Sequence, residues 1–348
     1  MALTGLGDRE RATLAGPALA AGWLAVAVAA FPALAGVDLS PTVRYAPLVA
    51  SALLFGMPHG AIDYVALPRA VAGEVTPRWL AVVGAVYLVL GGAYAAAWFA
   101  VPVAAALAFV AVTWLHWGQG DLYPLLAFLD VDYLDTRTRR AGTLLVRGGL
   151  PMLVPLLAFP AVYLDVAGWV VGAIDADIAM GSSVAPGVAV GAAVAFAALC
   201  LVHVLAGWRA APRDGRRGWA IDAGETVLLA LFFATVHPLL AIGLYFCLWH
   251  SLRHIVRLTE VPGYVPATAG RPWRAFAFHA APTTALALLF LAGLYALVPV
   301  TPASLDDAIG LYLVLIAVLT LPHVWVVLRM DRAENVWAAA DTKPTAAR

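Results

Sequence analysis

A series of apolar segments, each about 20 residues long, limits the folds open to this chain. A helix that crosses the hydrocarbon core of a bilayer needs about 20 mostly apolar residues. Of the 348 residues, 63% are hydrophobic and 12% are charged, against roughly 25% charged in an average soluble domain. The sequence therefore predicts an all-α, polytopic membrane bundle of about ten transmembrane helices. They are expected at Leu14–Leu34, Ala46–Leu67, Leu80–Ala100, Val103–Phe128, Thr143–Leu164, Gly187–Trp208, Trp219–Val236, Leu239–Leu258, Ala275–Val298 and Ala308–Arg329.

The distribution of arginine predicts how these helices are oriented, because cytoplasmic loops carry an excess of Lys and Arg. The connections after the fourth, sixth and eighth helices are rich in arginine, whereas those after the fifth and ninth carry aspartate and no basic residue. Both termini are therefore predicted to be cytoplasmic. The same pattern favours a hairpin with its turn at His237-Pro238 over one helix kinked at Pro238. The seventh helix is then expected to be short and to cross only part of the bilayer.

Composition also bounds the domain organisation and excludes some functions. We expect one transmembrane catalytic domain over residues 1–330 and a polar, disordered tail over 331–348. Ala33-Leu34-Ala35 resembles a signal-peptide cleavage site, but the apolar stretch is long for one and we favour its retention. The net charge of zero gives no electrostatic footprint for nucleic acid. The only lysine, Lys343, lies in the tail, which excludes a photoreceptor that binds retinal through a buried lysine.

The stretch YFCLWHSLRHI, from Tyr245 to Ile255, places His250 and His254 four residues apart in an apolar segment. On a helix such residues share one face, and ionisable groups inside a membrane indicate function by default. On the predicted topology, His59 and His116 lie within about 6 Å of this pair in depth. These four histidines predict one metal centre. An all-histidine set suits iron, zinc or copper, and the number of ligands alone leaves open whether the site is structural or catalytic.

Several other polar residues are expected near these histidines. Asp63 either accepts the second N–H of a ligand histidine or makes an interhelical contact. Arg253 either holds a carboxylate or anchors its helix at the water boundary. His323, in LPHVW, is the rival candidate for a further ligand or a close neighbour, and the alternative is that it lies merely near the site. The full set of candidates for a supporting role is Asp63, Gln119, Asp121, Glu225, Arg253 and His323.

The stretches FGMPHGAIDY, WLHWGQGD, HPLLAIGLYFCLWHSLRHI and LPHVW resemble the Brp/Blh family of β-carotene 15,15′-dioxygenases, in the family's order, from about Leu54 to Val327. In this chain His116 is followed by WGQGD, whereas the more common form of the family is HFG-x-x-D. Trp117 thus replaces one aromatic residue by another. The resemblance implies a multi-pass enzyme of the cell membrane that uses O2 to split β-carotene at its central double bond into two all-trans-retinal molecules. It also implies iron(II), Fe(2+), bound by His59, His116, His250 and His254.

This function sets further expectations. β-Carotene has no polar groups, so the site should open to the lipid bilayer, and a retinal-binding opsin is a candidate acceptor of the product. Oxygen chemistry at iron needs no protein nucleophile or general base, so the protein positions the substrate and excludes water. Two other classes stay open: a membrane transporter or proton relay, and a protein with a structural zinc site. Flat apolar side chains near the ligands are candidates to wall a substrate tunnel, namely Trp114, Trp117, Tyr245, Phe246 and Trp249.

Overall fold

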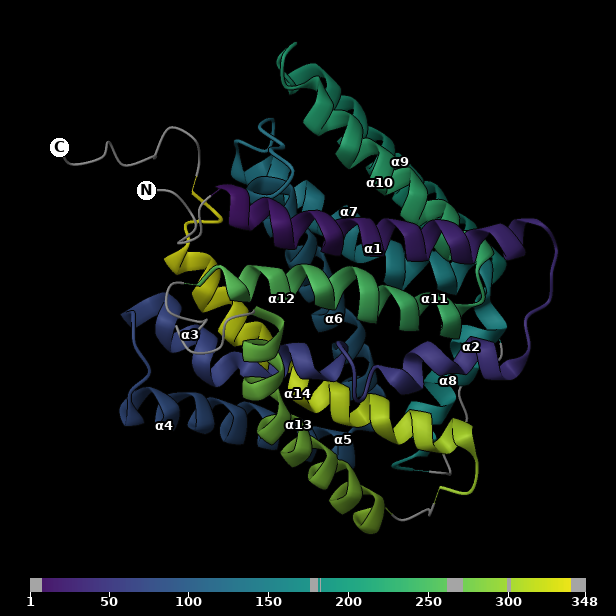
Figure 1. Cartoon of the computed structure of the whole chain (residues 1–348). Helices are drawn as coiled ribbons and strands as arrows, with labels where there is room; N and C mark the ends of the chain where they lie inside the picture. The colour runs from purple at the N-terminus through teal and green to yellow at the C-terminus, as the bar shows by residue number, and fades with distance from the viewer. Residues whose placement is uncertain (1–7, 176–180, 182, 262–271, 299–301, 339–348) are drawn as a thin grey trace.

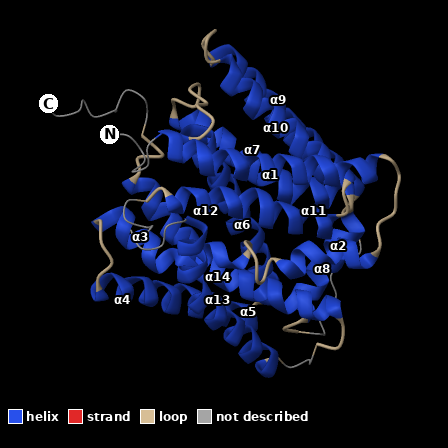
Figure 2. Cartoon of the chain, in the orientation of Figure 1, coloured by secondary structure: helices blue, strands red, loops and turns tan. Residues whose placement is uncertain are grey.

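The structure is a computed structural model that describes residues 8–175, 181, 183–261, 272–298 and 302–338. Every regular element within these residues is a helix (Figure 2), which confirms the predicted all-α fold. Nine stretches of the described chain are helical, long and apolar enough to cross a membrane. The protein is therefore a multi-pass membrane bundle.

The helices are labelled in chain order in Figure 1. They are α1 (Asp8–Leu34), α2 (Pro41–Ala50), η1 (Met57–Ile62), α3 (Asp63–Ala72), α4 (Pro77–Val86), η2 (Tyr87–Gly91), α5 (Gly92–Ala100), α6 (Pro102–Ala127), α7 (Arg137–Ala158), α8 (Pro160–Gly172), α9 (Pro186–Ala210), α10 (Arg216–Thr235), α11 (Pro238–Leu244), η3 (Tyr245–Ser251), α12 (Leu252–Thr259), α13 (Pro272–Leu297) and α14 (Leu305–Ala333).

The continuous helix formed by α11, η3 and α12 is the centre of the bundle. Its most apolar window is 83% buried, against 11–50% for the other eight candidate spans of the described chain. It packs on α1, α2 and α6 and runs alongside α1 in Figure 1. A helix enclosed on all sides has few lipid-facing positions, so the ionisable residues along it must find partners within the protein.

The predicted hairpin at His237-Pro238 is confirmed. The Arg253 guanidinium lies 2.5 Å from a carboxylate oxygen of Glu225, and the ring centroids of Phe233 and Tyr245 lie 5.4 Å apart in the packed core. One continuous helix would hold residues 28 positions apart at opposite ends. The prediction that the seventh helix is short is wrong, because α10 has 20 residues and qualifies as a full span.

The second predicted helix, Ala46–Leu67, is not continuous. The structure divides this stretch into α2, a non-helical turn and the 3₁₀ helix η1, which leads into α3. Pro58 lacks a backbone donor and disfavours helical geometry in the residue before it, so the ladder breaks here. Backbone that leaves helical geometry at membrane depth is tolerated where it is buried in protein or lines a cavity. His59 lies in this broken stretch.

The fifth predicted helix, Thr143–Leu164, is also wrong in its bounds. Helix α7 begins earlier, at Arg137, and ends at Ala158. Pro160 forces Phe159 out of the helical region, to φ −132° and ψ 57°. The chain then continues as the separate helix α8, which packs on α14.

The packed part of the chain extends beyond the predicted start of the tail. Asp331 lies inside α14 and is 1% exposed, and Val336 is 3% exposed. Residues 339–348 of the predicted tail lie outside the described residues. The start of α1 and the end of α14 lie at the same end of the bundle (Figure 1).

Helices α6 and α7 approach each other most closely at two glycines. A Cβ added at Gly118 would overlap the carbonyl oxygen of Leu144, and one added at Gly148 would overlap the carbonyl oxygen of Trp114. Small residues let membrane helices pack backbone to backbone. This contact fixes α6, which carries His116.

We expect Gly118→Ala to destabilise the protein by about 1–3 kcal/mol, because the added methyl group forces two backbones apart. Gly191→Ala, on a helix position with no atom within 4 Å of the added Cβ, is the matched control and should be neutral or slightly stabilising. Thermal unfolding of both variants in detergent measures the difference. Equal midpoints for the two would contradict the close packing of α6 and α7.

Candidate metal centre and apolar cavity

Five buried histidines from separate parts of the chain meet at the centre of the bundle. His59 lies on η1, His116 on α6, His250 on η3, His254 on α12 and His323 on α14. The ring centroids of the other four lie 5.0–6.2 Å from that of His59. Each of the five is at most 5% exposed. The structure thus brings together the four histidines predicted from depth, and it places His323 among them.

The nitrogen atoms of this cluster are close enough for a metal ion. One atom from each of His59, His116 and His323 lies within 4.8 Å of the others, and the same holds for Asp63, His254 and His323. The Nε2 atoms of His116 and His250 are 3.0 Å apart. His323 belongs to both three-residue groups, so it is central to the cluster and not at its edge.

Two of the histidines have the hydrogen bonds that a metal ligand needs. Nδ1 of His323 lies 2.8 Å from a carboxylate oxygen of Asp63, and Nδ1 of His59 contacts the carbonyl oxygen of Gly56. An N–H donated from Nδ1 leaves the lone pair on Nε2, and such outer partners orient ligand histidines. Both of these Nε2 atoms are buried without a hydrogen-bond partner in the described structure. Asp63 therefore bonds to His323 and not to His59, the histidine one turn before it, and it also accepts a hydrogen bond of 2.6 Å from Tyr87.

Departures from α-helical geometry position two of the histidines. His250 lies on η3, which has the wider turn of a π-helix, and His59 lies on the tighter 3₁₀ turn η1. Both forms are rare over such lengths and occur often at functional sites. The expectation that His250 and His254 stack on one α-helical face is therefore only approximate, although their rings are nearly parallel at 6.4 Å.

An apolar cavity of about 450 Å³ lies against the histidines. His59, His116, His323 and Asp63 form part of its wall, and most of the rest is apolar. It continues to Leu80 on α4 and to Leu286 and Phe290 on α13, whose exposed fractions are 42%, 50% and 59%. The cavity therefore joins the buried histidines to the outer surface of the bundle.

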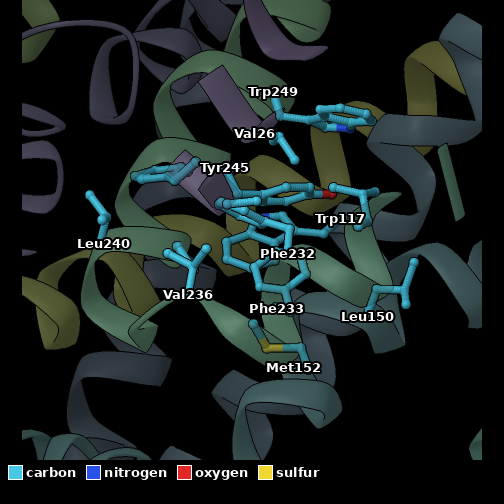
Figure 3. Close-up of a cluster of buried hydrophobic side chains, with 14 of the residues drawn as sticks. Val26, Trp117, Leu150, Met152, Phe232, Phe233, Val236, Leu240, Tyr245 and Trp249 are labelled. Atoms are coloured by element: carbon cyan, nitrogen blue, oxygen red, sulfur yellow. The ribbon is translucent and has the colours of Figure 1, made fainter. Parts of the chain in front are cut away.

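The aromatic residues predicted to wall a tunnel divide into two groups. Trp117 and Phe246 line the cavity. Three others, Trp114, Tyr245 and Trp249, are not among the described residues that line it. Tyr245 and Trp249 are fully buried in the packed core with Phe232 and Phe233 (Figure 3). These two residues therefore pack in the core and do not wall the cavity.

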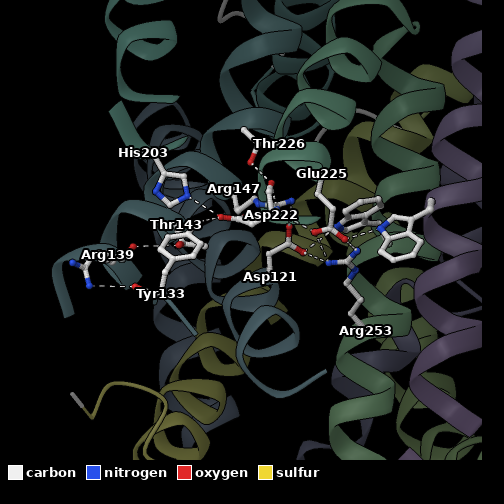
Figure 4. Close-up of polar contacts among 12 residues, drawn as sticks. Asp121, Tyr133, Arg139, Thr143, Arg147, His203, Asp222, Glu225, Thr226 and Arg253 are labelled. Atoms are coloured by element: carbon white, nitrogen blue, oxygen red, sulfur yellow. Dashed lines mark hydrogen bonds and ion pairs between the residues drawn. The ribbon is translucent and has the colours of Figure 1, made fainter. Parts of the chain in front are cut away.

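A buried network of charges lies beside the histidine cluster (Figure 4). Arg147 on α7 lies 2.6 Å from Asp222 and 3.0 Å from Glu225. Arg253 on α12 pairs with Glu225, and it lies 3.6 Å from Asp121 on α6. All five side chains are at most 3% exposed. Arg253 therefore holds carboxylates inside the bundle, and the alternative of an anchor at the water boundary is wrong.

Aromatic side chains complete this network. The indole N–H of Trp249 donates to Asp121 over 2.9 Å, and that of Trp23 donates to Glu225 over 2.6 Å. The Arg253 guanidinium also stacks 3.9 Å from the ring centre of Trp249, a cation–π contact. The network links α1, α6, α7, α10 and α12 and so fixes the helices that carry His116 and His254.

A second buried network ties α14 to the centre. Arg257 lies 2.7 Å from Asp331 and 2.8 Å from Glu334. The side-chain amide of Gln119 donates to Asp331 over 2.6 Å. Gln119 therefore joins α6 to α14, the helix that carries His323.

Sequence reasoning missed Arg147 and Asp222, although both lie within predicted transmembrane segments. A charged residue inside such a segment indicates function or a buried partner, and this signal marks both residues. His203 reaches the same network, with Nε2 3.2 Å from a carboxylate oxygen of Asp222. Their pairing partners come from other helices, so sequence spacing does not identify them.

The fold and the site define a multi-pass membrane protein with buried histidines at an apolar cavity. Residues 50–331 match the sequence profile of a family described as beta-carotene 15,15′-dioxygenase. The chain is 58% identical over 341 residues to the probable beta-carotene 15,15′-dioxygenase Blh of Halobacterium salinarum, covering 97% of this chain and 98% of that protein. It is 29% identical over 306 residues to the probable beta-carotene 15,15′-dioxygenase Brp of the same organism, covering 81% and 82%. No solved structure matches the chain.

The chain belongs to the β-carotene 15,15′-dioxygenase family. The family resemblance of its four histidine-containing stretches is thereby confirmed.

We expect Arg147→Met to destabilise the protein by about 3–5 kcal/mol, because it leaves Asp222 and Glu225 buried with too little positive charge. Arg139→Met is the control: Arg139 pairs with Asp135 at a partly exposed site, with exposed fractions of 33% and 44%. The loss there should be at most about 1 kcal/mol. Thermal and denaturant unfolding in detergent tests the difference, and similar losses for the two variants would contradict the role of the network.

Proposed function

We propose that the protein is a membrane dioxygenase that uses O2 to cleave β-carotene at its central 15,15′ double bond into two all-trans-retinal molecules. The observation that carries the proposal is the cluster of five buried imidazoles, three of which line an apolar cavity that reaches the exposed surface of the bundle. The names of the Halobacterium relatives agree with this activity.

The histidine cluster fits iron(II). Imidazole nitrogens suit this metal, and Nε2 of His59, His254 and His323 is buried without a partner in the described structure. Such nitrogens are costly unless something binds them. We propose that His59, His116, His250 and His254 hold the iron and that His323 faces the same ion. Bound iron(II) supplies the activation of O2.

The protein's own residues position the substrate and keep water out. The cavity wall offers a polyene flat or branched apolar side chains such as Trp117, Phe246 and Ile316. The reaction breaks one carbon–carbon double bond and adds one oxygen atom to each of the two carbons, so no proton is gained or lost. A general base is therefore not required, and pre-organised binding is the main contribution of the chain.

Access from the bilayer suits the substrate and the products. Leu80 on α4 and Phe290 on α13 belong both to the cavity wall and to the exposed surface of the bundle. An apolar polyene partitions into the hydrocarbon core and reaches this opening without crossing water. We propose that the enzyme acts in the cell membrane as one catalytic unit, with both termini in the cytoplasm, and that a retinal-binding opsin accepts the product.

The cavity favours this enzyme over a transporter or proton relay. A relay needs polar groups along a path between the two membrane faces. Here the arginines and carboxylates near the histidines are paired with one another, whereas the cavity that leads outward is mainly apolar.

Expression in cells that accumulate β-carotene tests the proposed function. We expect loss of the orange colour and two molecules of retinal formed for each β-carotene consumed. His250→Ala should abolish both iron binding and retinal formation, because it removes an imidazole from the centre of the cluster. His279→Ala, which changes a histidine outside the cluster, is the control and should retain both. Unchanged colour in aerobic, iron-replete cells that express the protein would refute the proposal.

The hydrogen bond between Asp63 and His323 provides a test of the iron site itself. We expect Asp63→Asn to weaken iron(II) binding by about 10- to 100-fold, because His323 loses the carboxylate that fixes its tautomer. Tyr87→Phe is the control, since it removes the other hydrogen bond to Asp63 and leaves the histidine contact in place. Metal titration of the purified protein measures both affinities. An unchanged affinity in Asp63→Asn would show that His323 does not face the ion.

A further inference from the structure

Helix α6 presents one face to the cavity, and Thr113 is the polar residue on that face before His116. The cavity-lining residues of this helix are Ala106, Phe109, Val110, Thr113, His116 and Trp117. Their spacing is that of a single helical face. Thr113 precedes His116 by three residues, so its hydroxyl lies about one turn from an imidazole of the cluster.

The hydroxyl of Thr113 is buried and has no hydrogen-bond partner among the described residues. The residue is 5% exposed. Several other helical threonines bond to a carbonyl oxygen four residues earlier, for example Thr226 to Asp222 over 2.8 Å and Thr320 to Ile316 over 2.6 Å. This local bond is the usual way for a helical threonine to satisfy its hydroxyl. Thr113 makes no such bond in the described structure, so its hydroxyl is unsatisfied in a residue that lines the cavity. Thr284 on α13 also lacks a partner, but it is not among the described residues that line the cavity.

The chemistry of the proposed reaction indicates which ligand accepts this O–H. β-Carotene has no hydrogen-bond acceptor, so the substrate leaves the hydroxyl unsatisfied. Each product carries one aldehyde oxygen, which is an acceptor and is created at the carbon atoms next to the histidine cluster. A buried donor that has no partner when β-carotene is bound, and gains one when retinal is bound, stabilises the product complex relative to the substrate complex.

We propose that Thr113 donates a hydrogen bond to the aldehyde oxygen of a retinal product and so forms a polar subsite in the apolar cavity. This inference rests on the proposed function. One product half then lies along the apolar wall with its aldehyde beside His116. The subsite adds affinity for retinal and none for β-carotene, and it slows the release of that product into the bilayer.

Binding of all-trans-retinal to the purified full-length protein in lipid nanodiscs tests the subsite without any turnover. Thr113→Val keeps the shape of the side chain and removes the donor, whereas Thr113→Ser keeps the donor. We expect Thr113→Val to weaken retinal binding by about 2- to 10-fold. The carbonyl stretching band of bound retinal should move to higher frequency in this variant, because the C=O bond is no longer hydrogen-bonded. Thr113→Ser should retain the wild-type band.

Thr320→Val is the matched control, because Thr320 lines the same cavity but its hydroxyl is already bonded to Ile316. It should leave the carbonyl band of bound retinal unchanged. If the valine variant at 113 does not fold, Thr113→Ala gives the same comparison with Thr113→Ser. An unchanged affinity and carbonyl band in Thr113→Val would overturn the proposal, as would an equal shift in Thr320→Val.

The two proposals fail in different ways. If the wild-type protein converts β-carotene and the carbonyl band of bound retinal is the same in Thr113→Val, the proposed function stands and the subsite is refuted. If the band depends on Thr113 but the wild-type protein forms no retinal in iron-replete, aerobic conditions, the proposed function is refuted and an aldehyde-binding site remains.

Discussion

The pairing of buried arginines with carboxylates holds this bundle together at its centre. Arg147 and Arg253 share Glu225 and reach Asp222 and Asp121 from different helices. In an apolar interior an isolated charge is expensive, and a pair is stable only when its geometry and remaining hydrogen bonds are satisfied. The requirement that these charges meet sets the relative positions of α6, α7, α10 and α12. Because two of these helices carry His116 and His254, the network also sets the histidine cluster.

Helix α6 contributes polar side chains to the buried networks and a mostly apolar face to the cavity. One face of α6 carries His116, Thr113 and Trp117 toward the cavity, whereas Gln119 and Asp121 turn to the buried networks. The networks are polar, paired and enclosed. The cavity is mainly apolar and continues to exposed leucine and phenylalanine side chains. The site thus combines buried, unpaired nitrogens with an apolar wall.

Much of the architecture follows from patterns within single segments. Apolar runs of about 20 residues predicted the crossings, and arginine-rich connections predicted the hairpin at His237-Pro238 that Arg253 and Glu225 confirm. The predicted helix bounds were wrong where a proline interrupts the backbone of an apolar run. Pro58 breaks the second crossing into α2, η1 and α3, and Pro160 ends α7. Hydropathy does not register these breaks, because proline interrupts the backbone without making the segment polar.

The sequence by itself determined that the protein is a helical membrane bundle, where most of its long apolar helices lie, and that His59, His116, His250 and His254 are candidates for one centre. These conclusions depend on composition, periodicity and depth, which are local properties. Only the tertiary structure decided that His323 joins the cluster, that Asp63 bonds to His323, and that Arg253 lies in the interior. Each of these is a contact between residues far apart in the chain. The physical reason is that a buried polar group takes the partner that packing brings to it, and packing is a property of the whole bundle.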